Sequence, residues 1–256
     1  MSDGPLRIEF GRYTEWILEA ADATGVSEPI AIACRGTGDP ALFADLAEGI
    51  RARAGMRVLD LGCGMGGPGS WLRSARDCDV IGFDLMFENV RAATRLLPES
   101  RGTVATTTAL PFATRSFDAL WAVGVLEMIE DKALALKEAS RVLRADGRAA
   151  VYTFTTTEKA QLVDPPASNH FVSPELVQAL AEDAGLEVAG ARVARIPPAV
   201  PARWVALRTA VAEEIARRHG GDPDYEAVRT ELARFARLRS TGAVVPWRFD
   251  LIKRGD

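Results

Sequence analysis

The sequence is poor in cysteine, and its few thiols form no recognisable pattern. Three cysteines, Cys34, Cys63 and Cys78, occur at spacings that match neither a zinc site nor a disulfide framework. Internal repeats and low-complexity segments are also lacking. We therefore expect reduced thiols and no metal site.

Long apolar runs and a large charge excess are missing as well. The longest apolar run, Ala119 to Leu126 with one glycine inside it, is far shorter than the ~20 residues that span a bilayer. The N-terminus carries acidic residues where a signal peptide requires a basic start and an apolar stretch. With 31 basic and 35 acidic residues the formal charge is −4, which is too balanced for non-specific nucleic-acid binding. We expect a cytoplasmic protein that binds neither membranes nor nucleic acids.

What is present is a composition typical of a globular protein with a sizeable core. The chain has 256 residues, of which 48% are apolar and 26% are charged. This length fits one large α/β domain with appended segments. The composition leaves the oligomeric state open, and a homodimer is one option.

Short apolar runs alternate with helical segments through the middle of the chain. The runs lie at Arg57–Leu61, Asp79–Phe83, Phe117–Val123 and Arg148–Phe154, with helical segments near Trp71, at Val90–Leu97 and at Lys132–Leu143. A helix opened by Ser173 and Pro174 and a strand at Leu186–Ile196 continue the pattern. This alternation is typical of βαβ units and predicts a doubly wound, mostly parallel sheet in an α/β core over residues 55–196.

Helical pieces flank this core on both sides. Residues 1–54 are expected to form an N-terminal helical cap, with one helix at Phe10–Ala23 and a second that begins after Asp39 and Pro40. Two arginine-rich amphipathic helices form an insertion over residues 197–245, and residues 246–256 supply a last strand. We interpret the insertion as a lid over a pocket, the alternative being a solvated helical hairpin.

The most informative segment is glycine-rich and joins the first strand to a helix. Gly62, Gly64 and Gly67 satisfy the dinucleotide fingerprint G-x-G-x-x-G, and Asp84 lies where a ribose-binding acid is expected. A nucleotide-dependent oxidoreductase is therefore one hypothesis. Asp60, two residues before Gly62, opposes it, because its carboxylate would repel a pyrophosphate and attract a cationic ligand such as S-adenosylmethionine.

Several ordered motifs across residues 56–154 extend this observation. After the glycine turn come Val80-Ile81-Gly82-Phe83-Asp84-Leu85, then Ala109-Leu110-Pro111-Phe112 with Ser116-Phe117-Asp118, then Ala122-Val123-Gly124-Val125-Leu126-Glu127, and finally Arg141-Val142-Leu143-Arg144-Ala145-Asp146-Gly147-Arg148. In residues and in order the series resembles the class I S-adenosylmethionine-dependent methyltransferases of the small-molecule type. The resemblance implies a Rossmann-like fold with a seven-stranded sheet.

The resemblance also implies a cofactor site for S-adenosyl-L-methionine. In this chain its residues would be Asp60, Gly62, Gly64, Asp84, Leu85, Thr107, Ala122 and Val123, with Asp84 holding the ribose hydroxyls. Two positions depart from the family pattern. Thr106 and Thr107 replace an Asp-Ala pair, so contact with the adenine is expected from backbone and hydroxyl groups, and Met128 stands where many relatives have a histidine.

Candidate residues for the acceptor lie outside the common core. His170, in the loop after the fifth strand, is the candidate general base. Tyr13 and Trp16 on the first helix present aromatic faces that can stabilise a sulfonium, and Arg35 in a glycine-containing loop can pair with a carboxylate. The predicted substrate-binding residues are Tyr13, Trp16, Arg35 and, within the core, Met128.

The leading hypothesis is thus an enzyme that methylates a small molecule by in-line transfer, with secondary metabolites among the candidate acceptors. Alignment in a dry pocket supplies most of the acceleration, and a general base is optional. A protein of this fold that binds the cofactor without transferring its methyl group, such as a cyclase or a binding protein, is the main alternative. The oxidoreductase is the weaker one.

Overall fold

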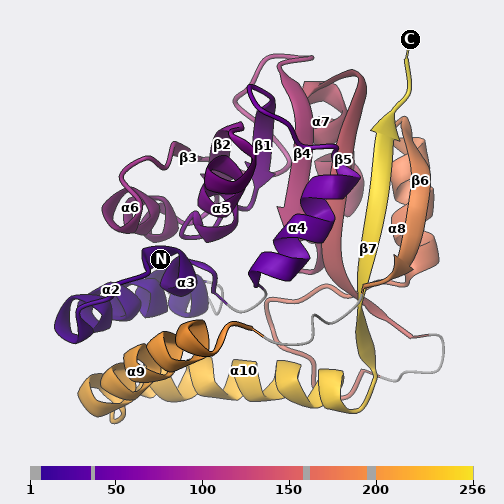
Figure 1. Cartoon of the computed structure of the whole chain (residues 1–256). Helices are drawn as coiled ribbons and strands as arrows, with labels where there is room; N and C mark the ends of the chain where they lie inside the picture. Colours follow the sequence, from indigo (N-terminus) through magenta and orange to yellow (C-terminus); the bar gives the residue numbers. More distant parts are fainter. Residues whose placement is uncertain (1–6, 36–37, 158–161, 195–199, 256) are drawn as a thin grey trace.

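The computed structural model describes residues 7–35, 38–157, 162–194 and 200–255, which form one seven-stranded sheet with helices around it (Figure 1). The strands are β1 (Arg57–Leu61), β2 (Asp79–Asp84), β3 (Gly102–Val104), β4 (Phe117–Val123), β5 (Leu143–Thr156), β6 (Leu186–Val193) and β7 (Val244–Lys253). The helices are η1 (Ile8–Arg12), α2 (Tyr13–Thr24), α3 (Pro29–Ala33), α4 (Pro40–Gly49), α5 (Gly67–Arg76), α6 (Phe87–Leu96), η2 (Leu126–Met128), α7 (Lys132–Val142), α8 (Pro174–Asp183), α9 (Ala202–His219) and α10 (Pro223–Ser240).

The strand order across the sheet is β3-β2-β1-β4-β5-β7-β6. Strands β1 to β5 pair in parallel, whereas β7 runs antiparallel to both of its neighbours, β5 and β6. The order reverses between β1 and β4, which is where open α/β sheets bind their ligands. The predicted fold class, a mostly parallel seven-stranded Rossmann-like sheet, is confirmed.

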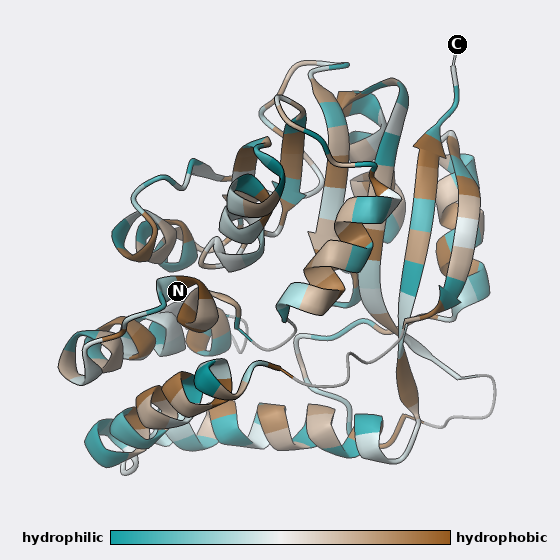
Figure 2. Ribbon diagram, in the orientation of Figure 1, coloured by the Kyte–Doolittle hydropathy of each residue, from teal (hydrophilic) through white to brown (hydrophobic). Residues whose placement is uncertain are grey.

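Two helical layers cover the faces of the sheet. Helices α4 and α5 pack on one face, around the buried rings of Phe43 and Trp121, and α7 and α8 pack on the other, around Phe117 and Phe249. Because both faces are covered, the central strands are apolar along most of their length, which Figure 2 shows as brown segments. This burial explains why continuous apolar runs rather than alternating ones marked the strands in the sequence.

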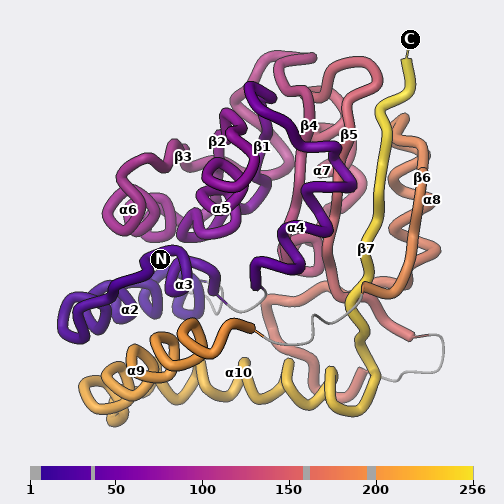
Figure 3. Tube along the Cα trace, in the orientation of Figure 1, coloured from indigo at the N-terminus to yellow at the C-terminus, as the bar shows by residue number. Residues whose placement is uncertain are grey.

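A third helical layer lies across the carboxyl ends of the parallel strands. It consists of α2 and α3 from the N-terminal part and of α9 and α10, which are inserted between β6 and β7 (Figures 1 and 3). Helix α2 packs on α9 through an apolar cluster that contains Trp16, Val211 and Ile215. Segments far apart in the chain thus meet over the edge where the ligand is expected.

Several local expectations are matched and others need adjustment. Asp39 caps α4 by accepting hydrogen bonds from Ala41 N at 2.8 Å and Leu42 N at 3.1 Å, as its position before Pro40 predicts. The short elements α3 and β3 were not expected, since three to five residues carry too little periodicity to register. The last strand begins at Val244, two residues earlier than predicted, and residues 195–199 of the proline-rich corner lie outside the described residues.

Three further observations on the described part of the chain concern membrane spans, metal sites and cysteines. None of its helices combines the length and apolarity that crossing a membrane requires. The same residues contain no cluster of histidine, cysteine and carboxylate side chains arranged for a metal ion. Cys34, Cys63 and Cys78 are all buried as free thiols.

Candidate active site

A cavity of about 480 Å³ opens at the carboxyl ends of β1, β2 and β4. Its wall is formed by η1, the residues after α3, the β1–α5 turn and the loops that follow β2, β3 and β4. The volume lies in the range of small-molecule and cofactor sites. Of the residues predicted to bind the cofactor, the wall contains Asp60, Gly62, Gly64, Asp84, Leu85, Thr107 and Val123.

Ala122 is the one member of that set outside the wall. It pairs with Leu61 in the sheet and its side chain belongs to the apolar core. The alternation of side chains along β4 therefore turns Ala122 away from the cavity that Val123 lines.

The β1–α5 turn brings backbone to the surface of the cavity. Gly64 has φ of +53°, and a Cβ built on it meets no atom within 4 Å. Gly62 also has a positive φ, but a Cβ there would lie 2.4 Å from Val125 Cγ2. The positive φ favours glycine at both positions, and at Gly62 there is also no space for a side chain. At Gly64 the space that a side chain would fill is part of the cavity, where a ligand can approach the backbone.

Asp84, at the end of β2, is held in the wall by three donors. Its Oδ2 accepts a hydrogen bond from Gly64 N at 2.9 Å, and its Oδ1 accepts from Met86 N at 2.9 Å and Asn89 Nδ2 at 3.0 Å. Burial raises the pKa of this carboxyl, and the three donors oppose that rise. A carboxylate offers about four acceptor positions, so capacity remains for a ligand hydroxyl.

Asp60, near the end of β1, is the second buried carboxyl of the wall. Only 2% of the residue is exposed, and within the described chain its Oδ2 has no hydrogen-bond partner. Burial raises the pKa of Asp60 to about 7. A cationic group nearby would stabilise the ionised form of this side chain.

The candidate acceptor residues separate into two groups. Arg35 and Met128 lie in the wall of the cavity, whereas Tyr13 and Trp16 do not. Trp16 is buried and stacks on His219, with ring centroids 4.6 Å apart and planes 16° apart. Its position joins α2 to α9, which is a packing role. Tyr13 contacts the cavity indirectly, because its ring lies 4.9 Å from Cζ of Arg35.

The backbone of His170, and not its ring, makes the contacts that hold this residue near the segment after β4. Its N donates to the carbonyl of Glu127 at 2.6 Å, and its carbonyl accepts from Lys132 Nζ at 2.5 Å. The residue is exposed and is not part of the cavity wall. These contacts fix the loop after β5 against the segment after β4.

Glu127 is a buried carboxyl that was not among the residues predicted to be catalytic. Its Oε2 accepts a hydrogen bond from Thr153 Oγ1 at 2.7 Å, and burial raises its pKa to about 7. Glu127 is not part of the cavity wall, although Val125 and Met128 beside it in the sequence are. The signal for Glu127 in the sequence is its position directly after the apolar run that ends at Leu126.

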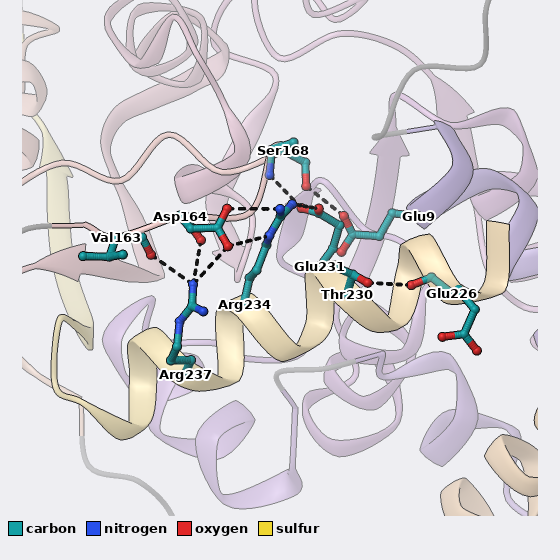
Figure 4. Close-up of polar contacts among 10 residues, drawn as sticks. Glu9, Val163, Asp164, Ser168, Glu226, Thr230, Glu231, Arg234 and Arg237 are labelled. Atoms are coloured by element: carbon teal, nitrogen blue, oxygen red, sulfur yellow. Dashed lines mark hydrogen bonds and ion pairs between the residues drawn. The ribbon is translucent and has the colours of Figure 1, made fainter. Parts of the chain in front are cut away.

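Polar contacts join three segments, namely η1, which contributes Phe10 to the cavity wall, the loop after β5 and α10 (Figure 4). Ser168 Oγ donates to Glu9 Oε2 at 2.8 Å, which connects the loop after β5 to η1. Ala167 N donates to Glu231 Oε2 at 2.7 Å, and Asp164 accepts from Arg234 Nε at 3.0 Å, so the same loop is tied to α10. We call these contacts the loop–helix network.

Comparison with known proteins finds a match to one family over the middle of the chain. Residues 59–151, which span β1 to β5 and most of the cavity wall, match the family model described as a methyltransferase domain. Residues 59–151 are therefore similar to a methyltransferase domain, and they include the glycine turn, Asp84 and the segment after β4. In contrast, η1, Arg35, His170 and the inserted helices lie outside the matched residues.

Curated relatives are similar to a part of the chain. One is methyltransferase GfsG of Streptomyces halstedii, 34% identical over 113 residues, which is 41% of this chain and 40% of the relative. Another is the 27-O-demethylrifamycin SV methyltransferase of Amycolatopsis mediterranei, 34% identical over 119 residues, 43% of this chain and 42% of the relative. The similarity thus spans about two fifths of this chain and of each relative.

Solved structures share the whole architecture. The [4+2]-cyclase SpnF superposes with a TM-score of 0.73 at 19% identity, covering 97% of this chain and 96% of that one. The cyclopropane synthase MmaA2 of Mycobacterium tuberculosis gives a TM-score of 0.67 at 19% identity and covers 83% of each chain. At this level of identity the similarity establishes the fold alone.

Proposed function

We propose that this protein transfers the methyl group of S-adenosylmethionine to a small-molecule acceptor. The observation that carries the proposal is the shared cavity in which the open face of Gly64 meets two buried carboxyls, Asp60 and Asp84. The match to a methyltransferase domain supports it, as do the curated relatives, whose names describe methyltransferases.

The wall of the cavity fits the parts of this cofactor. Asp84 is placed to accept from ribose hydroxyls, and the space over Gly64 admits a ligand against the backbone. Leu85 and Thr107 line the same cavity and are assigned to the adenine side, as the motif order implies. Asp60 lines the same cavity, and the charge of its carboxylate suits the ammonium group.

Charge argues against the nucleotide-dependent oxidoreductase. A dinucleotide carries an anionic pyrophosphate to the glycine turn, where the carboxyls of Asp60 and Asp84 both line the cavity. A ligand with an ammonium and a sulfonium group turns that repulsion into attraction. We therefore place the oxidoreductase hypothesis last.

In the proposed reaction the bound cofactor supplies an electrophilic methyl group on sulfur. The chain's own residues align the two reactants and exclude water. The loop–helix network ties η1, which contributes Phe10 to the cavity wall, to the loop after β5 and to α10. We propose that these segments, with α9, form the lid and select the acceptor, and that the enzyme works in the cytoplasm.

Incubation with a methyl-labelled cofactor tests the function directly. We expect label from S-adenosylmethionine to appear in a low-molecular-weight product when the enzyme is supplied with a metabolite extract. The Gly64→Val variant serves as the matched control. Cofactor binding without any labelled product would favour the cyclase or binding-protein alternative, and preferential binding of a nicotinamide dinucleotide would favour the oxidoreductase.

The His170→Ala variant tests whether a general base contributes. Loss of a general base lowers turnover by about 10²–10⁴-fold. Because the ring of His170 is exposed and outside the cavity wall, we expect turnover to stay close to that of the parent enzyme, with unchanged cofactor affinity. Steady-state kinetics on the labelled product measures both quantities. A large drop in turnover would restore His170 as the base and require the loop after β5 to move.

Cofactor affinity should depend on pH through Asp60. Burial raises the pKa of Asp60 to about 7, and a bound cation lowers it, so binding expels a proton below that pH. Affinity should therefore rise with pH by up to about tenfold per unit and level off above about pH 7. Calorimetric titration between about pH 5.5 and 7 measures this slope, with S-adenosylhomocysteine as the ligand because it retains the ammonium group. In this range the ligand's amino group stays protonated and does not contribute to the slope.

Two variants assign the slope to a residue. Asp60→Asn removes the titrating group from the cavity and should flatten the profile. Glu127→Gln is the matched control, because burial raises the pKa of Glu127 to about 7 as well while its side chain lies outside the cavity wall. A profile that flattens in Glu127→Gln and persists in Asp60→Asn would contradict the assignment.

A further inference from the structure

A second cavity, of about 330 Å³, lies at the opposite end of the sheet from the candidate active site. Strand β4 begins beside it, shortly after Thr114 and Arg115 of its wall, and ends at Val123 in the wall of the active-site cavity. Strand β7 runs antiparallel to β5, so its last residue, Lys253, reaches the same edge of the sheet, at the top of Figure 1. The volume is typical of small-molecule sites, and the described walls of the two cavities share no residue.

The wall of this second cavity is basic, although the chain as a whole has a net charge of −4. Among the described residues it contains one carboxylate, that of Asp183, and four cationic side chains, namely Arg115, Lys137, Arg141 and Lys253. The chain has only four lysines, and two of them lie in this wall. Cations gathered in one hollow create a positive potential there, which favours an anionic ligand.

Arg141 has a structural role in this wall. Its guanidinium forms an ion pair with Glu138 on α7, and it donates to the carbonyl of Phe112 at 2.8 Å and to that of Leu110 at 3.0 Å. These bonds fix the segment before β4, which brings Arg115 into the wall. Because Glu138 offsets the charge of Arg141, the attraction for an anion comes from the other cations.

Lys137 and Lys253 carry charges that remain available. In the described part of the chain neither forms an ion pair with a carboxylate. Lys253 Nζ donates to Ser140 Oγ at 2.8 Å, and Ser140 is buried on α7, so this contact holds the ammonium group against the helix. Lys137 lies three residues before Ser140 and therefore on the same face of α7. Two ammonium groups from different elements thus line one cavity.

A phosphate-bearing anion matches this arrangement. An ammonium group is a compact charge with three donors, which suits phosphate oxygens that accept hydrogen bonds from several directions. The hydroxyl side chains of Thr114 and Ser140 add polar groups to the same wall. We propose that this cavity binds a small phosphorylated anion of the pyrophosphate type, with Lys137 and Lys253 as its main contacts. The site is separate from the proposed methyl transfer and does not depend on it.

Calorimetric titration with inorganic pyrophosphate at low ionic strength tests the site. Lys137→Met and Lys253→Met should each lower the affinity at least about tenfold, because each removes a charge-assisted contact with the anion. Arg53→Met is the matched control. Arg53 is exposed and lines a different cavity at the same edge of the sheet, where Arg144 and Arg148 also lie, and its replacement changes the net charge by the same amount. This control should keep the affinity of the parent protein.

Acetylation of lysines with an N-hydroxysuccinimide ester gives a second readout at single residues. Lys137 is exposed and Lys253 is half-buried, whereas Lys132 is only 4% exposed. We expect pyrophosphate to slow the acetylation of Lys137 and Lys253, as measured by mass spectrometry of the peptides. Citrate at the same ionic strength carries carboxylates instead of phosphates, and it should protect these two lysines much less.

Four results would overturn the proposal. A parent protein that does not bind pyrophosphate would exclude the site, and equal weakening in Lys253→Met and Arg53→Met would mean that affinity follows net charge alone. Equal protection by citrate would reject a preference for phosphate. A lower melting temperature with unchanged affinity in Lys253→Met would mean that Lys253 only stabilises α7 through Ser140.

Discussion

Gly64→Val is expected to abolish detectable cofactor binding in a protein that still folds. The Cβ of the new side chain meets no protein atom within 4 Å, so it projects into the cavity where the ligand approaches the backbone. The positive φ of +53° adds strain of about 1–2 kcal/mol, which a folded domain tolerates. Calorimetry with S-adenosylhomocysteine measures binding, and circular dichroism with thermal melting measures folding.

Gly55→Val is the matched control for backbone strain. Gly55 has φ of +75°, an equally open Cβ direction and a place in the exposed turn before β1, away from the cavity. This variant should lose a comparable amount of stability and keep full affinity. Normal affinity in Gly64→Val would show that the ligand does not approach this turn and would remove the main support for the proposed function.

Asp84→Ala is expected to weaken cofactor binding by at least about tenfold. A charge-assisted hydrogen bond contributes about 1.5–3 kcal/mol, so one such bond to a ribose hydroxyl already accounts for this loss. The substitution also removes the acceptor for Gly64 N and Met86 N, and it should therefore lower the melting temperature. Calorimetric titration below the melting transition separates the two effects.

Asn89→Ala separates contact with the ligand from support of the carboxylate. It deletes one of the three donors to Asp84, and the contact with Thr14, but keeps the carboxylate itself. We expect a smaller loss of affinity than in Asp84→Ala. If both variants lost the same affinity, Asp84 would act by positioning the turn, and an undiminished affinity in Asp84→Ala would exclude it from the site.

The parts of the site that were predictable from sequence are those formed by contiguous residues. The β1–α5 turn runs directly from Asp60 through Gly62 and Gly64, and Asp84 ends the next strand. Strand, turn and helix are local structures, and parallel strands bring their carboxyl ends to one edge. The order of motifs therefore places Asp60, Gly64 and Asp84 in one cavity without reference to packing elsewhere.

Packing between distant segments decided the rest. Trp16 and Tyr13 share a helix, yet contact with α9 turns Trp16 into a stacking partner of His219 while Tyr13 meets Arg35. His170 follows β5 as predicted, but its backbone contacts with Glu127 and Lys132 leave the ring exposed. Such outcomes depend on side-chain rotamers and on the docking of helices, which no spacing along the chain encodes.

The sequence by itself thus determined the sheet type, the glycine turn and the acids at the strand ends, because each follows from periodicity or from adjacency in the chain. Only the tertiary structure showed that the guanidinium of Arg35 lies against the rings of Phe10 and Tyr13. It also showed that the loop after β5 is tied to η1 through Ser168 and to α10 through Ala167. These two hydrogen bonds join residues more than sixty positions apart in the sequence. Their partners are decided only when the chain packs, because polar groups that lose contact with water then need hydrogen bonds within the protein.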